Sequence, residues 1–451
     1  MIDLTRSTHR TVCLCRNRVH GLFCLVAVVS LLSSQPAARA TDLNADPIKY
    51  ATAPAHNVIE QLRSRLESGQ VRPPRDPKMG YLPSLLKALH IPESSQVLVY
   101  SKTSLQRHRI SPATPRALYF NDDVYLGYCQ QGNVIEVSAV DPRLGTVFYT
   151  VDQKSPEKVT FTRQTETCLL CHGSSSNQGF PGHLVRSVYV DAQGLPILGF
   201  GTHRTDHTSP LKERWGGWYV TGTAGKQIHL GNLIADESKA EPEEIDNSRG
   251  LNVTNLSDRI NTSAYLSGQS DIVALMVLEH QVEMHNLLGR AALQTRCALH
   301  EQAALNKELG KSLNEPWDSV KSRINSAAEY VVKYMLMSGE AQLSGNIEGT
   351  TSFARDFAQR GPTDRKGRSL REFDLQRRLF RYPCSYLIYS AAFDGLPCPV
   401  KDRILRRLWE VLTGKDESKE FAHLSPSDRQ AIFEILLDTK QDLPPYWRSP
   451  K

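Results

Sequence analysis

Three residues with a fixed spacing carry the clearest chemistry in this chain of 451 residues. Cys168, Cys171 and His172 form a C-x-x-C-H sequence, which is the attachment spacing of c-type haem. Two thiols at this spacing can each capture one vinyl group on the same edge of a porphyrin, and the histidine that follows lies under the iron. The motif therefore predicts one covalently bound haem c, with Cys168 and Cys171 as the thioether residues and His172 as the proximal iron ligand.

The same two cysteines have other possible uses, namely a redox dithiol, a disulfide or half of a zinc site. A four-ligand zinc site needs a second close pair of ligands. His203 and His207 have the spacing of such a pair, but they lie much further from Cys171 than a zinc finger allows. We expect haem at the motif, and a Cys168–Cys171 disulfide is the alternative.

Four side chains are candidates for the distal ligand of the iron. A long apolar pattern over residues 270–306 predicts a helix, and at 100° per residue His280 is central in its apolar stripe, with Met284 close by. A distal histidine would lower the reduction potential and a methionine would raise it. The competing interpretation is a core histidine and a packing methionine. His183 and His229 lie nearer to the motif in the sequence and are the other two candidates.

Further side chains could complete a haem site. The aromatic and glycine residues between Trp215 and Tyr219 either pack on the haem or form a glycine bulge inside an aromatic core. Guanidinium groups match the carboxylates of haem propionates, and the arginines considered for this role are Arg186, Arg204 and Arg214. A haem enzyme would also need an acid or base, for which the candidates are His183, Asp206 and His207.

The remaining cysteines suggest one disulfide. Export favours oxidised pairs, and Cys384 and Cys398 flank a Gly-Leu-Pro turn between two expected helices. A bond closing that hairpin would contribute about 3 kcal/mol in the chain-entropy model. The pairing of Cys129 and Cys297 stays open, since sequence does not fix connectivity.

The first forty residues read as an export signal. A basic region is followed by an apolar run over residues 21–33 and by Ala38-Arg39-Ala40, the pattern of a signal peptide cleaved after Ala40. The apolar run is shorter than the ~20 residues that span a bilayer, and we expect no membrane span in the mature chain. An uncleaved anchor is the alternative. The sequence thus predicts a periplasmic or otherwise exported protein.

The charge of the mature chain gives no reason to expect a nucleic-acid partner. The formal net charge is +6, but the first forty residues hold five arginines and one aspartate, which leaves +2 for the rest. Aromatic residues make up 8% of the chain, too many for a largely disordered protein. The chain is therefore expected to fold around sizeable cores.

The elements around the motif are expected to be mainly strands before residue 235 and helices after it. Short segments rich in Val, Ile, Tyr and Phe, separated by turn residues, predict strands over residues 96–101, 116–120, 123–129, 133–140, 145–151, 158–162, 184–190, 195–201 and 215–221. Apolar periodicity predicts helices over residues 56–68, 81–90, 270–306, 318–338, 381–393, 400–412 and 427–438.

The expected fold class is α+β, with a β-rich haem-bearing N-terminal domain followed by a mainly α-helical C-terminal region. It is not the small all-helical cytochrome c fold, because no helix-like aromatic stripe precedes Cys168 and the next methionine after the motif is Met276. The expected division is a signal peptide (1–40), a helical N-terminal segment (41–90), a β-rich domain (91–235), an acidic linker (236–250) and a helical domain (251–445).

Several strings beyond the motif carry a family resemblance. They are R-A-L-Y-F-N at 116–121, residues 139–149, P-G-H-L-V-R-S-V at 181–188, E-R-W-G-G-W-Y-V-T-G at 213–222 and residues 382–394. With the C-x-x-C-H motif, the chain resembles a family of exported bacterial proteins that carry a single c-type haem motif and are described as cytochrome c-like. The resemblance covers most of residues 80–445. It implies a haem and no particular activity.

Three functions follow from these observations. The leading expectation is a periplasmic electron-transfer protein that exchanges electrons with a redox partner protein. The second is a haem enzyme or sensor, peroxidase-like or acting on a small molecule, with an open sixth iron position. The third is an exported structural or binding protein whose Cys168 and Cys171 form a disulfide. No Ser-His-Asp signature, phosphate loop or H-E-x-x-H sequence indicates a hydrolase or kinase. Whether the chain is an enzyme, and its oligomeric state, stay open.

Overall fold

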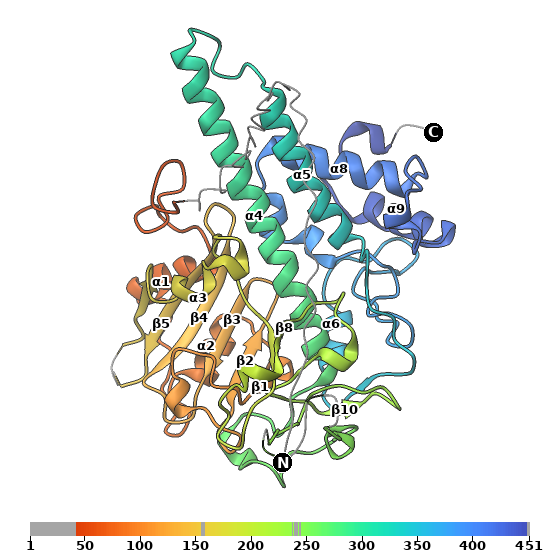
Figure 1. The fold of residues 1–451 in the computed structure, drawn as a ribbon. Helices are drawn as coiled ribbons and strands as arrows, with labels where there is room; N and C mark the ends of the chain where they lie inside the picture. Colours follow the sequence, from red (N-terminus) through yellow and green to blue (C-terminus); the bar gives the residue numbers. More distant parts are fainter. Residues whose placement is uncertain (1–41, 155–157, 237, 239–241, 243–244, 449–451) are drawn as a thin grey trace, which may run out of the picture. The chain divides into compact units, whose positions relative to one another are not determined.

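An antiparallel sheet of seven strands forms the N-terminal half of the fold (Figure 1). The computed structural model describes residues 42–154, 158–236, 238, 242 and 245–448, so the expected signal peptide lies outside the described residues. The order across the sheet is β6-β5-β4-β3-β2-β1-β9. The strands are β1 (Val97–Val99), β2 (Arg116–Phe120), β3 (Val124–Tyr128), β4 (Val134–Asp141), β5 (Gly145–Asp152), β6 (Phe161–Gln164) and β9 (Trp218–Tyr219).

Local turn chemistry explains why these strands pair as a meander. The side chain of Asn121 accepts hydrogen bonds from the backbone of Asp123 and Val124 and closes the turn between β2 and β3. Asp141 does the same for the turn between β4 and β5, where Gly145 takes a φ of +74° that favours glycine. The strands expected over residues 116–151 are therefore confirmed.

One face of the sheet packs against the N-terminal helices α1 (Val58–Glu67) and α2 (Leu82–Ala88). Side chains alternate along a strand, so Leu126, Val137 and Tyr149 point to this face and join a buried apolar cluster with both helices. We call it the α1/α2 face.

The opposite face packs against α4 (Ile272–Glu308), which runs beside the sheet and continues past it next to α5 (Asp318–Met335) (Figure 1). Phe120, Tyr125 and Val140 point to this face, which we call the α4 face. The side chain of Asp271 accepts hydrogen bonds from the first turn of α4 and begins the helix. The cluster on this face continues into the C-terminal helices, so sheet and helices share one core.

The C-terminal half is helical, and the α+β class is confirmed. Besides α1, α2 and α4, the helices are α3 (Leu169–His172), α5 (Asp318–Met335), α6 (Phe353–Ala358), α7 (Ala391–Asp394), α8 (Cys398–Leu412) and α9 (Pro426–Thr439). Two short sheets pair β7 (Arg186–Val188) with β8 (Thr202–Arg204) and β10 (Gly222–Thr223) with β11 (Glu348–Gly349). Within the described part of the chain, no helix has both the length and the apolar character to cross a membrane.

Two element predictions were wrong. The strand expected over residues 195–201 is a 3-10 turn at Leu198–Phe200, and β8 begins only at Thr202. The helix expected over residues 381–393 is split into the 3-10 turn Tyr386–Tyr389 and α7, because the Ser390 side chain caps the start of α7. Apolar spacing alone does not show such a break.

Candidate functional site

The C-x-x-C-H motif lies on α3, a single helical turn that follows β6. The backbone N–H of His172 bonds to the carbonyl of Cys168 at 3.0 Å, so the two cysteines stand at opposite ends of one turn. Cys168 is half-buried, Cys171 is exposed, and both are free thiols. The turn thus presents two unpaired sulfurs at the spacing that thioether attachment needs.

The imidazole of His172 is held by a hydrogen bond at one of its two ring nitrogens. Its Nδ1 lies 2.9 Å from the carbonyl oxygen of Gly182, and because a carbonyl only accepts, Nδ1 carries the proton. Within the described residues the opposite nitrogen, Nε2, makes no hydrogen bond, so its lone pair is free. The ring of Phe148 lies 4.7 Å from that of His172 between centroids. Burial lowers the pKa of His172, which keeps the ring neutral.

The loop after the motif is tied back to His172. The backbone carbonyl of His172 accepts one hydrogen bond from the side-chain amide of Asn177 and one from the backbone N–H of Gly182, both at 3.0 Å. A Cβ at Gly182 would lie 2.3 Å from the side-chain oxygen of Asn286 on α4, so only glycine fits between the loop and α4. These contacts fix the carbonyl that holds the Nδ1 proton.

Sequence reasoning missed an ion pair on the α4 face beside the motif. Arg116 on β2 and Glu136 on β4 are paired at 2.5 Å, and both are largely buried. Burial raises the pKa of Cys168 to about 11, with Glu136 adding to the rise and Arg116 opposing it. Alternation in the segment 133–140 places Glu136 opposite to the apolar Ile135 and Val137, and this signal could have indicated a polar patch.

The three motif residues are the donor set that haem c would use. No group of three or more His, Cys, Asp or Glu side chains in the described residues could hold a metal ion. His203 lies 3.7 Å from Glu213, and His207 is buried against His280, so they form no ligand pair with the motif. Attachment of haem c requires two thiols and one imidazole nitrogen on one side of the iron, and the motif contains these groups.

His183 is the distal candidate in ring contact with the motif, with its centroid 6.5 Å from that of His172. Its Nε2 lies 2.7 Å from the hydroxyl of Ser138 and its Nδ1 3.4 Å from that of Thr146. Burial lowers the pKa of His183 well below 6.5. Both ring nitrogens are therefore engaged with the sheet.

The other three distal candidates lie within the core. His280 bonds to Nδ1 of His207 and to the Ser385 hydroxyl, each at 2.8 Å. Met284 is fully buried in the apolar cluster on α4. His229 accepts from the backbone of Gly231 at 3.1 Å and packs its ring against Trp215. Within the described part of the chain, none of these three side chains contacts His172.

The tryptophan–glycine segment and the three arginines serve mainly local packing. Trp215 and Trp218 are buried, and Gly217 has a φ of +81° with no room for a Cβ beside Ser101. The three arginines all have protein partners, Arg186 bonding to Thr202, Arg204 to Ser176 and Glu283, and Arg214 to Glu279.

The predicted Cys384–Cys398 disulfide is not formed in the structure. Cys384 is buried and Cys398, the first residue of α8, is exposed, and both are free thiols. Cys129 and Cys297 are free as well. Burial raises the pKa of Cys384 to about 12, so this thiol is unreactive.

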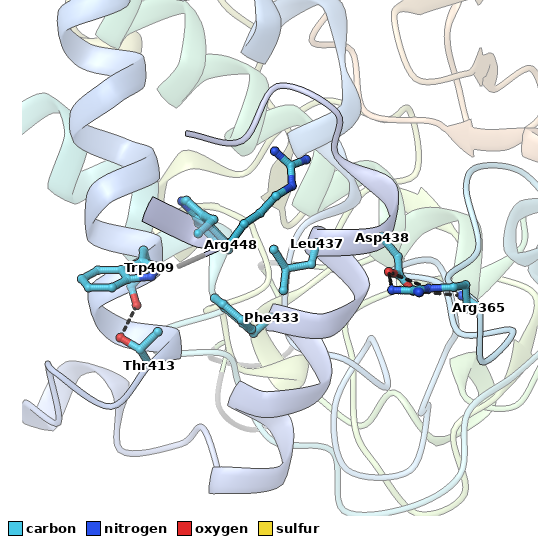
Figure 2. A pocket seen from close by; sticks show the side chains of 8 residues that line it. Arg365, Trp409, Thr413, Phe433, Leu437, Asp438 and Arg448 are labelled. Atoms are coloured by element: carbon cyan, nitrogen blue, oxygen red, sulfur yellow. Dashed lines mark hydrogen bonds and ion pairs between the residues drawn. The ribbon is translucent and has the colours of Figure 1, made fainter. Parts of the chain in front are cut away.

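A pocket of about 380 Å³ lies far along the chain from the motif, between α8 and α9 (Figure 2). Its wall is aromatic, with Trp409, Phe433 and Trp447. At its rim Arg365 is held by Asp438 through paired hydrogen bonds. The charge of Arg365 is thus already neutralised, whereas Arg448 also lines the pocket, and the pocket contains no residue of the motif.

Comparison with protein-family models, with curated proteins and with solved structures finds no match. The functional argument therefore rests on the residues of this chain.

Proposed function

We propose that the chain is an exported, c-type cytochrome-like protein that carries one covalent haem c and exchanges electrons with a redox partner protein. Cys168 and Cys171 would hold the haem as thioethers, and His172 would be the proximal ligand. This function agrees with the resemblance of the chain to exported proteins with a single c-type haem motif. When bound, the haem supplies a one-electron couple between ferric and ferrous iron.

One observation carries the proposal. A histidine with its Nδ1 proton held by the Gly182 carbonyl and its Nε2 free stands one turn from two unpaired thiols. A ligand histidine has one ring nitrogen oriented by a partner and the other left for the metal. Among the described residues, the Nε2 atoms of His207 and His285 also lack a hydrogen-bond partner, but they belong to histidines buried in the core.

The surroundings of the motif support the same proposal. Leu170, between the two cysteines, exposes 79% of its surface, while Leu169 packs against the sheet. An exposed leucine at this point suits an apolar cofactor or a partner surface next to it. Phe148 packs on the His172 ring and restricts its rotation.

The test is expression of the chain with a c-type maturation system, followed by a pyridine haemochrome assay and intact mass. We expect one haem per chain that survives acid extraction. The Cys168→Ser/Cys171→Ser double variant should carry no covalent haem, and the matched control Cys398→Ser, which also removes an exposed thiol, should keep it. Absence of covalent haem from the wild-type chain would refute the proposal.

A second candidate function is a haem enzyme or sensor with an open sixth iron position. The observation that favours it is the engagement of both ring nitrogens of His183 and of His280 with protein partners. Carbon monoxide distinguishes the two functions. A ferrous protein whose spectrum ignores carbon monoxide has two protein ligands and is an electron carrier, and one that binds it readily has an open or labile position.

A further inference from the structure

On the α4 face of the sheet, an ion pair between two strands passes over a glycine on the strand that lies between them. Arg116 on β2 and Glu136 on β4 are separated by β3, where Gly127 pairs with Glu136 on one side and with Leu118 on the other. The Arg116 side chain crosses β3 at this point, and a Cβ on Gly127 would lie 2.2 Å from its Nη2. Glycine is therefore the residue that lets the guanidinium lie on the sheet.

The carboxylate of Glu136 is fixed in turn. One oxygen pairs with Arg116 at 2.5 Å, and the other accepts from Ser104 at 3.2 Å and from Gln106 at 3.3 Å. The Nε of Arg116 is buried and has no hydrogen-bond partner among the described residues. The guanidinium of Arg116 is thus paired with the Glu136 carboxylate, and its Nε–H donor is not used.

The sheet register places this pair next to the haem motif. Glu136 pairs with Thr150, and Phe148 lies two residues from Thr150 on the same face. Diagonal neighbours of this kind have Cβ atoms about 7 Å apart. The ring centroids of Phe148 and His172 lie 4.7 Å apart. Glu136 of the ion pair is therefore a diagonal neighbour of the residue on which His172 packs.

The two charges act unequally on the motif. Burial is the main cause of the lowered pKa of His172, the Gly182 bond opposes it, and Arg116 then lowers it more than Glu136 raises it. At Cys168, after burial, the order is reversed and Glu136 acts more strongly. The sheet register sets both charges beside the motif, on the side of Phe148.

We propose that Arg116, held across Gly127 by Glu136, is a positioning residue that raises the reduction potential of the haem. This inference rests on the proposed haem function. Reduction adds one negative charge at the iron, so a nearby cation stabilises the reduced form and a nearby carboxylate opposes reduction. Low solvent exposure of the pair strengthens the effect, and arginine stays charged at all working pH values.

The experiment is a spectroelectrochemical titration of the haem-loaded full chain. Arg116→Gln should shift the midpoint potential to a lower value, and Glu136→Gln should shift it to a higher value. Gly127→Ala is the sharpest variant, since it keeps every charge and displaces the guanidinium. It should lower the potential, by less than Arg116→Gln does, because the charge is moved and not removed. Arg365→Gln, which removes an arginine beside the aromatic pocket, is the control and should leave the potential unchanged.

An unchanged or higher potential in haem-loaded Arg116→Gln would overturn the inference, and so would an unchanged potential in haem-loaded Gly127→Ala. If Arg116→Gln does not fold, Arg116→Lys keeps the charge without the planar fork, and its potential should fall less than that of Gly127→Ala. Failure of the haem proposal is seen separately, because the wild-type chain would then give no haemochrome at all.

Discussion

The motif and the middle of α4 each carry a histidine, but the ring nitrogens of the two are bonded in opposite ways. His172 is partly exposed, has one nitrogen held by a backbone carbonyl and leaves the other free. His280, in α4, is fully buried with its two nitrogens bonded to His207 and Ser385. The difference separates a histidine available for a ligand from one that holds the core together.

The same contrast extends to the neighbouring charges. Arg214 and Glu279 form an ion pair in the α4 region with side chains 4% and 0% exposed, at 3.1 Å. The Arg116–Glu136 pair beside the motif is 18% and 16% exposed. An ion pair that is closed off from solvent contributes to the packing of the core. An ion pair beside the motif can act electrostatically on a group that is bound at the motif. Substitutions in the two regions should therefore separate stability from haem properties.

The largest expected effect is on the closed pair. Arg214→Met leaves Glu279 buried without its cation, which should lower the free energy of unfolding by about 3–5 kcal/mol. Denaturant unfolding measures the change, with Arg204→Met as the control because its ion pair with Glu283 is more exposed. A loss below about 1 kcal/mol would show that the Arg214–Glu279 pair is not the closed pair described here. Haem content per folded chain should stay unchanged.

Met284 gives the next effect. This residue is fully buried in the cluster on α4, and Met284→Ala should cost about 3 kcal/mol through the cavity it leaves. Met284→Leu, of nearly equal volume, is the matched control and should cost under about 1.5 kcal/mol. A changed haem spectrum in the folded Met284→Leu protein would contradict a purely packing role, because the account places Met284 in the core.

Acid should weaken the interior through its buried histidines. Burial lowers the pKa of His285 from 6.5 to about 4, so the unfolded chain takes up this proton at a higher pH than the folded one. The stability from this group is present above pH 6.5 and is lost as pH falls toward 4. Relative to His285→Gln, the wild type should lose about 1.4 kcal/mol per pH unit in that window. Parallel pH profiles for the two proteins would mean that His285 does not titrate as described.

The smallest effect should come from the exposed side of the motif. Leu170→Gln should change the free energy of unfolding by less than about 0.5 kcal/mol, because Leu170 is largely in solvent. Leu169→Gln should cost more, since Leu169 packs against the sheet cluster. Equal losses in the two variants would remove the distinction between the packed and the open side of α3.

The sequence was sufficient for the strands of the meander, the long helices and the motif itself. The apolar segments around Tyr125 and Ser138 and the apolar periodicity around Met276 are visible in the sequence because most of their side chains are buried. It was not sufficient for contacts that depend on register. Nothing local shows that Gly127 lies under the Arg116 side chain, because β2 and β3 must pair in register before the two residues meet, and β4 must pair as well before Arg116 meets Glu136.

The distal candidates show the same limit. A helical wheel places His280 on the buried stripe of α4 but does not say which element faces it there. In the structure that element is the segment that carries His207, together with Ser385. His183 was chosen by nearness in sequence, and its ring does lie next to that of His172, held by two sheet hydroxyls that no spacing rule identifies.

The most direct test of the account is the intact mass of the mature chain after expression with c-type maturation. The account predicts a single species heavier than the polypeptide by one haem, with the mass lost in the Cys168→Ser/Cys171→Ser variant. A wild-type chain at the polypeptide mass, or lighter by the two hydrogens of a disulfide, would contradict the central claim that this motif holds a haem.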